Sequence, residues 1–147
     1  MKAVAVFCLC VSASLAVRAA PGTIILFNGT SSAGKSSLAD VMIRESEQKY
    51  EVLSYDDFLR SYRQERGITW LNPEQYRDFL LSLYRHARNR SDAGTNVIID
   101  TVEFDLAYEK YCELLNCSNV IKTIVYCPLE PLLKRIDRRN SAYLFSG

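Results

Sequence analysis

The stretch Ile24-Ile25-Leu26-Phe27-Asn28-Gly29-Thr30-Ser31-Ser32-Ala33-Gly34-Lys35-Ser36 decides the fold of this 147-residue chain. Its apolar beginning predicts a strand over residues 23–27 that is covered on both faces. Residues 29–36 then match the pattern G-x-x-x-x-G-K-[ST], directly before a helix that should begin near Lys35. This order of strand, loop and helix favours a phosphate-binding loop over a structural Gly/Ser turn.

The chemistry of the loop explains the order of its residues. The two glycines let backbone N–H groups turn inward around phosphate oxygens, and the helix that follows adds its positive end. Lys35 is then placed to reach the β- and γ-phosphates, and the Ser36 hydroxyl is placed to bind Mg²⁺. We therefore expect ATP and Mg²⁺ as ligands, with a nucleotide-binding set of Gly29, Thr30, Ser31, Ser32, Ala33, Gly34, Lys35, Ser36 and Ser37.

The rest of the chain alternates apolar, β-branched runs with helical periodicity. Further strands are predicted over residues 50–55, 96–100 and 121–126. Such alternation is typical of an α/β domain with helices on both faces of a mostly parallel sheet. We predict one three-layer domain of the P-loop NTPase type over residues 20–147.

The helices are predicted from apolar stripes at three- and four-residue spacing, which should pack on the sheet. Asn72-Pro73 is typical of a helix start, Gly94 of a helix end, and Pro128 with Pro131 of the opening of a last helix. The two central stripes consist of Tyr76, Phe79, Leu80, Leu83, Tyr84 and Ala87, and of Phe104, Ala107, Tyr108, Tyr111, Leu114 and Leu115.

Two carboxylates follow the second predicted strand, in Ser54-Tyr55-Asp56-Asp57-Phe58-Leu59. Side chains at the carboxyl ends of parallel strands face the ligand crevice. A kinase that acts on a hydroxyl needs a group to accept or orient its proton, so Asp56 is the candidate base. The alternative is structural, because either Asp56 or Asp57 is suited to cap the following helix.

Asp100 ends the apolar run Val97-Ile98-Ile99. In P-loop proteins an acidic residue at such a strand end holds Mg²⁺ directly or through water. The pattern is weak alone, because strands often end in Asp, and it gains weight from the phosphate loop in the same chain. We predict a metal site made of Ser36 and Asp100.

Two arginines four residues apart, Arg135 and Arg139, share one face of the last predicted helix. Arginines there are placed to stabilise the charge of a transferring phosphoryl group. The alternative is a solvated basic face. The predicted apolar stripe of this helix is Leu129, Leu132, Leu133 and Ile136, and the predicted catalytic set is Asp56, Lys35, Arg135 and Arg139.

The cysteines and the tryptophan favour packing roles. Cys112, Cys117 and Cys127 show neither C-x-x-C spacing nor a zinc pattern, and their disulfide state is left open. Trp70 lies in an irregular segment just before Pro73. We expect it to pack at a boundary, with a binding role as the alternative.

The composition is ordinary for a globular domain, with 48% hydrophobic and 24% charged residues. The formal net charge is +1, and no block of like charges is present in the sequence. We therefore expect a small-molecule partner with a hydroxyl acceptor, and neither nucleic acid nor an anionic membrane surface. The oligomeric state is left open.

Residues 1–19 differ from the rest of the chain. A basic Met1-Lys2, an apolar run over residues 3–17 and the small-residue exit Arg18-Ala19-Ala20-Pro21 are typical of a secretory signal peptide. The run is shorter than the roughly 20 residues of a spanning helix, so no stable span is expected after cleavage following Ala19. We expect export, with a cytoplasmic protein as the alternative if the start is misassigned.

Taken in order, these elements make the sequence resemble the chloramphenicol phosphotransferase-like family of P-loop kinases. The resemblance rests on residues 24–36, including Asn28 and the interior Thr30-Ser31-Ser32-Ala33, and it extends over most of residues 23–140. The other matching stretches are Tyr55-Asp56, Ile98-Ile99-Asp100, a strand ending at Cys127, and the pair Arg135 and Arg139.

The resemblance implies that Asp56 acts as base toward the acceptor hydroxyl and that residues 29–36 form the phosphate loop. The family continues past its lid arginines with a further helix and strand, whereas here only residues 140–147 follow, which indicates a domain that is short at its C-terminus. No residue between Asp57 and Asn96 matches the family closely enough to predict chloramphenicol as the acceptor.

Two alternatives remain open at this stage. The first is a zeta-toxin-like kinase of a nucleotide-sugar. The second is a nucleotide-binding protein without turnover, motivated by the short C-terminus.

Overall fold

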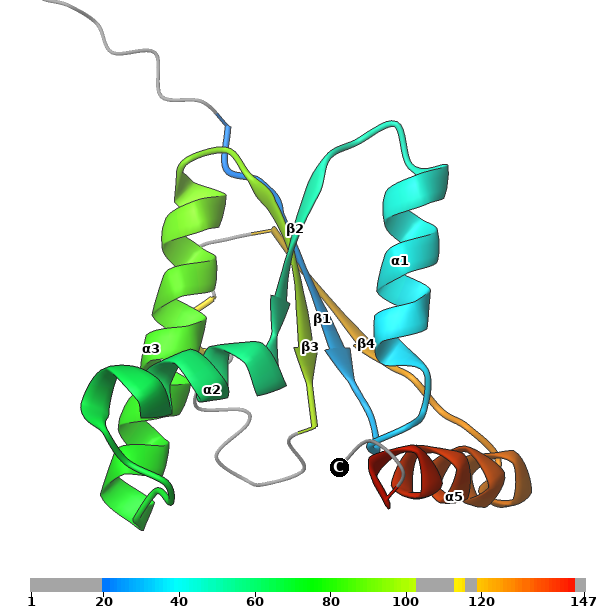
Figure 1. Cartoon of the computed structure of the whole chain (residues 1–147). Helices are drawn as coiled ribbons and strands as arrows, with labels where there is room; N and C mark the ends of the chain where they lie inside the picture. The colour runs from blue at the N-terminus through cyan, green and yellow to red at the C-terminus, as the bar shows by residue number, and fades with distance from the viewer. Residues whose placement is uncertain (1–19, 103–112, 116–118, 145–147) are drawn as a thin grey trace, which may run out of the picture.

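A computed structural model describes residues 20–102, 113–115 and 119–144 (Figure 1). Its sheet has the strand order β2-β3-β1-β4, and every pair of neighbours is parallel. This confirms the predicted α/β fold with a parallel sheet. The strands are β1 (Thr23–Asn28), β2 (Tyr50–Ser54), β3 (Asn96–Thr101) and β4 (Asn119–Ile124).

The helices form layers on both sides of this sheet. Figure 1 shows α1 on one face and α2 with α3 on the other, while α5 lies beside the carboxyl end of β4. The bounds are α1 (Lys35–Glu45), α2 (Tyr55–Arg66), α3 (Pro73–Asp92) and α5 (Leu129–Leu144). No helix among the described residues is both long enough and apolar enough to cross a bilayer.

Local signals explain where these elements begin and end. Asn72 caps α3 in a capping box with Gln75, and Pro73 occupies the first turn, as the sequence predicts. The Ser54 side chain caps α2 by accepting a 3.4 Å hydrogen bond from the Asp57 N–H. The alternative that an aspartate caps this helix is therefore wrong, and β2 stops at Ser54 because Tyr55 already belongs to α2.

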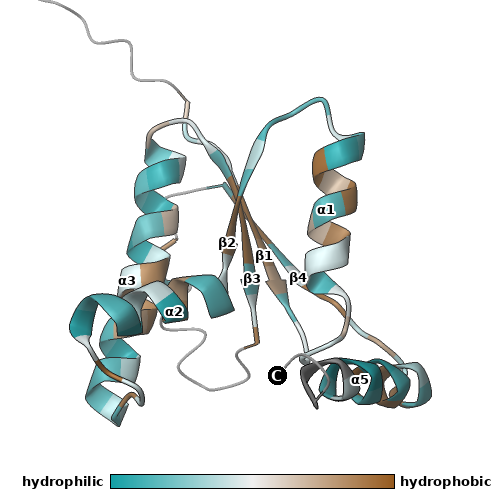
Figure 2. Ribbon diagram, in the orientation of Figure 1, coloured by the Kyte–Doolittle hydropathy of each residue, from teal (hydrophilic) through white to brown (hydrophobic). Residues whose placement is uncertain are grey.

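The core divides at the sheet because successive strand residues point to opposite faces. Figure 2 shows the resulting apolar strands between helices whose outer sides are hydrophilic. The cluster under α1 is small and contains Ile25, Phe27, Ala39 and Ile98. The cluster under α2 and α3 is larger and contains Ile24, Leu26, Leu53, Tyr62, Phe79, Leu80, Leu83, Tyr84, Ala87, Val97, Ile99 and Leu115.

Five of the six residues in the first predicted stripe are buried, which confirms its role in the core. The exception is Tyr76, which is 39% exposed. The second predicted stripe lies mostly within residues 103–112, outside the described residues, although Leu115 at its end is buried.

Tyr62 combines burial with a polar contact. Its hydroxyl donates a 2.7 Å hydrogen bond to Asp78 Oδ2, and the Arg66 guanidinium lies 3.7 Å from the centre of its ring. Burial, followed by the hydrogen bond and the negative charge of Asp78, raises the pKa of Tyr62, against a smaller opposite effect of Arg66. Tyr62 is therefore a neutral buried donor.

Two packing predictions do not hold. Trp70 is 81% exposed, because it lies in the connection between α2 and α3, where the Arg63 guanidinium lies 5.8 Å from its ring centre. On α5, Leu129 and Leu133 of the expected apolar stripe are 68% and 50% exposed, since the helix lies past the edge of the sheet. By contrast, Cys127 is buried with a free thiol, as expected for a packing residue.

Candidate functional site

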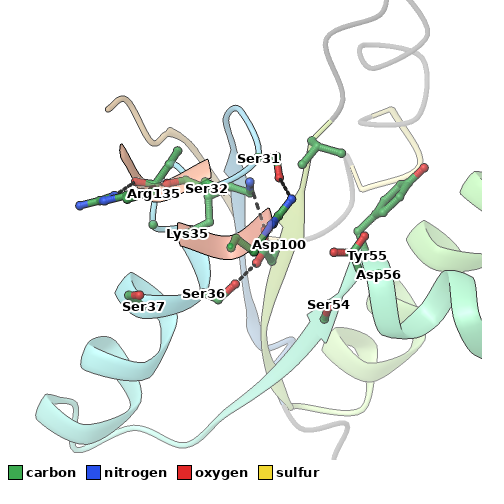
Figure 3. A pocket seen from close by; sticks show the side chains of 14 residues that line it. Ser31, Ser32, Lys35, Ser36, Ser37, Ser54, Tyr55, Asp56, Asp100 and Arg135 are labelled. Atoms are coloured by element: carbon green, nitrogen blue, oxygen red, sulfur yellow. Dashed lines mark hydrogen bonds and ion pairs between the residues drawn. The ribbon is translucent and has the colours of Figure 1, made fainter. Parts of the chain in front are cut away.

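The register of the parallel sheet assembles the site. Asp100 on β3 pairs with Phe27 on β1 and with Ser54 on β2, so all three lie at the same carboxyl edge. A cavity of about 570 Å³ opens at this edge (Figure 3). It is lined by Ser31, Ser32, Ala33, Gly34, Lys35, Ser36, Ser37, Ser54, Tyr55, Asp56, Asp100, Val102, Arg135 and Arg139.

The phosphate loop has an open helix end. Gly34 occupies the N-cap position of α1 with φ 104°, and no side chain caps the helix. Ser32 also has a positive φ, 64°, and the Ala33 N–H donates to the Thr30 carbonyl to close a turn between them. Uncapped N–H groups at a helix N-terminus are suited to bind an anion.

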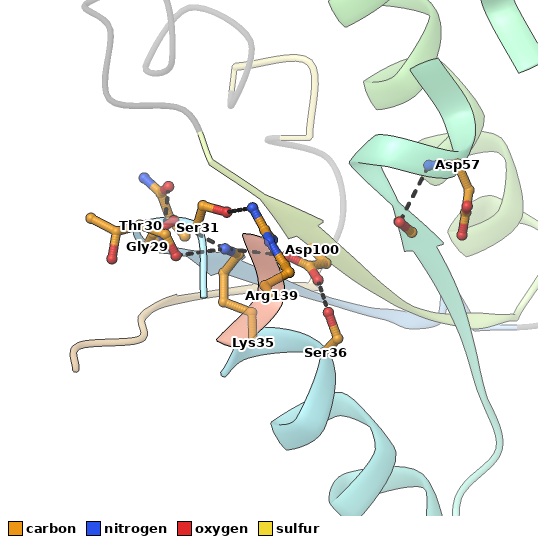
Figure 4. A network of polar contacts seen from close by, with 10 residues as sticks. Gly29, Thr30, Ser31, Lys35, Ser36, Asp57, Asp100 and Arg139 are labelled. Atoms are coloured by element: carbon orange, nitrogen blue, oxygen red, sulfur yellow. Dashed lines mark hydrogen bonds and ion pairs between the residues drawn. The ribbon is translucent and has the colours of Figure 1, made fainter. Parts of the chain in front are cut away.

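Lys35 lies under the loop with 6% of its surface exposed. Its Nζ donates to the carbonyl oxygens of Gly29 at 3.0 Å and Thr30 at 3.1 Å, and lies 3.6 Å from Asp100 Oδ1 (Figure 4). These contacts satisfy a buried cation and hold it directly beside the loop. A phosphate bound in the loop would therefore lie beside this positive charge.

Ser36 and Asp100 present hard oxygen ligands side by side. The Ser36 hydroxyl donates a 2.7 Å hydrogen bond to Asp100 Oδ2. Over the described ranges there is no cluster of three or more His, Cys, Asp or Glu side chains. This donor set fits Mg²⁺, which is commonly bound by one or two protein oxygens together with phosphate oxygens and water.

Asp56 faces the loop from the other side of the cavity, in the first turn of α2 (Figure 3). Its neighbour Tyr55 also lines the cavity and packs edge-on against Phe79 at 5.1 Å between ring centres. Asp57 does not line the cavity and forms a 3.0 Å ion pair with Arg60. The structure therefore separates the two neighbouring aspartates, of which only Asp56 faces the cavity.

The two predicted arginines of α5 both reach the phosphate loop. Arg135 Nη1 donates to the carbonyl oxygens of Ala33 at 3.0 Å and Ser32 at 3.4 Å. Arg139 Nη2 donates to Ser31 Oγ at 3.0 Å (Figure 4). The alternative of a purely solvated basic face does not apply to these two side chains.

All of the predicted site residues except Gly29 and Thr30 line the cavity. Three further lining residues, Ser54, Tyr55 and Val102, were not predicted. Each lies next to a strand end that the sequence analysis had identified. Their positions next to predicted strand ends could have identified them, because the carboxyl ends of parallel strands lie at one edge of the sheet.

A comparison with family profiles gives a match over residues 22–143 to the family described as chloramphenicol phosphotransferase-like protein. The chain belongs to the chloramphenicol phosphotransferase-like family. The match includes the phosphate loop, Asp56, Asp100 and both arginines of α5. Membership therefore confirms the resemblance on which the sequence analysis relied.

Solved structures show the same fold. The APS kinase of Mycobacterium tuberculosis, in complex with AMPPNP and APS, is 18% identical with a TM-score of 0.66 over 83% of this chain and 72% of that one. A sugar kinase from Janibacter sp. HTCC2649 is 25% identical with a TM-score of 0.59 over 81% and 68%. A chain of the Pnkp1/Rnl/Hen1 RNA repair complex is 21% identical with a TM-score of 0.65 over 81% and 38%.

This member of the chloramphenicol phosphotransferase-like family spans well under half of the RNA repair chain. No curated protein matches its sequence. Family and fold together identify a P-loop domain of the kinase or phosphotransferase kind.

Proposed function

We propose that the protein transfers the γ-phosphoryl group of ATP to a hydroxyl group of a small molecule. One observation carries the proposal: Asp56 faces a phosphate loop across a single cavity, with Asp100 at the strand end between them. A loop alone would serve a nucleotide-binding protein. A carboxylate opposite the loop is what phosphoryl transfer to a hydroxyl requires in addition.

On this proposal the loop and Lys35 bind the phosphates of ATP. The uncapped N–H groups of α1 hold phosphate oxygens, and the Lys35 ammonium balances their charge. Ser36 and Asp100 would hold Mg²⁺, which neutralises charge on the phosphates when bound. Arg139 lies near enough to contribute a second positive charge.

Asp56 serves the acceptor. Its carboxylate takes the hydroxyl proton as the acceptor oxygen bonds to the γ-phosphorus, while the bond from that phosphorus to the bridging oxygen of ADP breaks. The rest of the acceleration in phosphoryl transfer comes mostly from positioning and charge stabilisation. Tyr55, supported by Phe79, supplies a rigid aromatic wall beside it.

The residues that line the cavity near Asp56 also limit the charge that the acceptor can carry. Within residues 20–102, this side of the cavity comprises Ser54, Tyr55 and Val102 besides Asp56, and none of these four carries a positive charge. A negatively charged acceptor would therefore meet Asp56 without a balancing cation among these four residues. We infer that the acceptor is neutral or cationic.

The inferred charge of the acceptor can be tested with sorbitol, gluconate and glucamine. These three compounds share a six-carbon chain that carries hydroxyl groups, and they differ in charge. We expect gluconate to consume ATP at least about 10-fold less efficiently than sorbitol or glucamine, because the carboxylate is repelled. A preference for gluconate would contradict the inference. A wider screen of hydroxylated metabolites would then identify the acceptor.

The paired aspartates test the function. Asp56→Asn should bind ATP as tightly as wild type while losing phosphoryl transfer by about 100-fold or more, the usual contribution of a general base. Asp57→Asn is the matched control, because this exposed carboxylate lies outside the cavity. If the wild type binds ATP without transfer or hydrolysis and Asp56→Asn changes nothing, the protein is a nucleotide-binding module instead.

A further inference from the structure

The two arginines of α5 make different kinds of contact with the phosphate loop. Arg135 bonds to main-chain carbonyl oxygens, those of Ser32 and Ala33, at 3.4 and 3.0 Å. Arg139 bonds to a side chain, the Ser31 hydroxyl, at 3.0 Å. The first contact holds the path of the backbone, whereas the second holds only an exposed and rotatable group.

The backbone at the Arg135 contact needs support. Ser32 has φ 64°, a left-handed conformation that costs free energy for a residue with a Cβ atom. In a phosphate loop the N–H groups turn toward the phosphates, which leaves carbonyl oxygens such as those of Ser32 and Ala33 to be satisfied elsewhere. A guanidinium group that bridges both carbonyls stabilises this shape with charge-assisted hydrogen bonds.

The fit around Arg135 is also close. A Cβ atom placed on Gly34 would lie 3.2 Å from Arg135 Nη1. Gly34 already has φ 104°, a backbone conformation that favours glycine. The second glycine of the motif therefore supplies the turn of the chain, and a Cβ atom there would require the guanidinium group to shift by a few tenths of an ångström.

Arg139 is placed to exchange its bond to Ser31 for one to a bound phosphate group. Its hydrogen bond to the neutral Ser31 hydroxyl is exposed. A phosphate oxygen offers the same guanidinium group an opposite charge in addition to a hydrogen-bond acceptor, whereas the Ser31 hydroxyl offers the acceptor alone. A nucleotide in the loop would therefore compete successfully with Ser31 for Arg139.

We propose that Arg135 is a positioning residue, which holds the phosphate loop in its binding shape through the Ser32 and Ala33 carbonyls, and that Arg139 is the arginine that contacts the γ-phosphoryl group. The assignment for Arg139 rests on the proposed function. The assignment for Arg135 rests on the loop contacts, and it holds for any nucleotide bound there.

Hydrogen exchange tests the positioning role without an acceptor. In the nucleotide-free protein, Arg135→Ala should speed amide exchange in a peptide covering residues 29–37, while the melting temperature stays close to that of wild type because the side chain is exposed. Arg138→Ala is the matched control: it removes the same charge from an exposed site on α5 that makes no hydrogen bond to the loop in the described structure. Unchanged loop exchange in Arg135→Ala would overturn the role.

Nucleotide titrations separate the two arginines. Arg135→Ala should weaken ADP and AMPPNP, each with Mg²⁺, by a similar factor of about 10, because both need the same loop shape. Arg139→Ala should leave ADP binding within about twofold and remove most of the preference for AMPPNP over ADP. Equal weakening of ADP by both variants would overturn the division of roles.

The outcomes also distinguish this inference from the proposed function. If wild type binds both nucleotides but phosphorylates no acceptor, the proposed transfer fails while the exchange result still tests Arg135. If transfer occurs and loop exchange is the same in wild type and Arg135→Ala, the positioning role fails while the proposed function stands.

Discussion

Ser36 Oγ donates a 2.7 Å hydrogen bond to Asp100 Oδ2, although 64 positions separate the two residues in the sequence. The other oxygen of the same carboxylate lies 3.6 Å from Lys35 Nζ. One strand-end carboxylate thus joins the hydroxyl and the ammonium of the phosphate loop. The pairing of Asp100 with Phe27 across the parallel sheet sets this distance.

This relationship predicts a loss of metal dependence. In Ser36→Ala and in Asp100→Asn, affinity for ATP in the presence of Mg²⁺ should fall by about 10- to 100-fold, whereas affinity measured in EDTA should change much less. Calorimetric titration under both conditions is the measurement. Asp40→Asn, an exposed carboxylate on α1, serves as the control. Equal losses with and without Mg²⁺ would argue against the metal assignment.

Lys35 is predicted to dominate nucleotide binding. Lys35→Ala should weaken ATP and ADP by roughly 100-fold, because a desolvated ammonium beside phosphates is worth about 1.5–3 kcal/mol in hydrogen bonds to charge. Fluorescence titration against the exposed-site variant Lys49→Ala is a suitable comparison. Should wild type and Lys35→Ala bind equally weakly, the phosphate-loop assignment fails.

Gly29 is predicted to be sensitive for a packing reason. A Cβ atom at this position would lie 2.3 Å from the Val125 carbonyl oxygen, which belongs to the chain just after β4. Gly29→Ala must therefore separate the ends of β1 and β4, at about 1–3 kcal/mol and about 3 to 10 °C in melting temperature. Thermal unfolding followed by circular dichroism measures this, and an unchanged midpoint would contradict it.

The raised pKa of Tyr62 predicts that the protein loses stability at alkaline pH. Its pKa is raised in the folded protein above the ordinary value of about 10, so its contribution is complete below pH 10 and is lost as the pH rises through the folded pKa. Tyr62→Phe should cost about 1 kcal/mol at neutral pH through the lost bond to Asp78. Denaturant titrations should show the gap between the two proteins narrowing above pH 10; a gap independent of pH would refute the coupling.

The first 19 residues predict a processed N-terminus. We expect the mature chain to begin at Ala20, because cleavage after Ala19 places small residues at the recognition positions. Mass spectrometry of the secreted or periplasmic fraction after expression is the direct measurement. An intact Met1 on protein in the cytoplasm would count against export.

Local patterns were sufficient for most of the fold. Continuous apolar runs predicted every strand boundary to within two residues, and Asn72-Pro73 predicted the start of α3, because capping and burial depend on neighbouring residues. Apart from the aspartate considered as the cap of α2, the predictions that failed were about exposure. Trp70 and Leu129 are apolar residues whose burial depends on which elements lie beside them in space.

In the candidate site, too, some residues could be identified from local sequence and others only from the tertiary structure. Gly29, Gly34, Lys35 and Ser36 were identified by the motif, since a phosphate loop is a local structure whose backbone conformation follows from its own residues. The sequence made Asp56 the candidate base, but it left open that Asp56 or Asp57 caps the following helix. Only the cap at Ser54 and the turn of α2 decide that Asp56 faces the cavity and that Asp57 pairs with Arg60 outside it.

The sequence by itself determined a parallel α/β domain with a phosphate loop, because strand periodicity, glycine spacing and caps act over a few residues. Only the tertiary structure decided which groups meet in the site. Asp100 meets the Ser36 hydroxyl, and Arg135 meets the Ala33 carbonyl oxygen. The members of these pairs are 64 and 102 residues apart in the chain. Distances of that kind depend on strand order and helix packing, which no local pattern specifies.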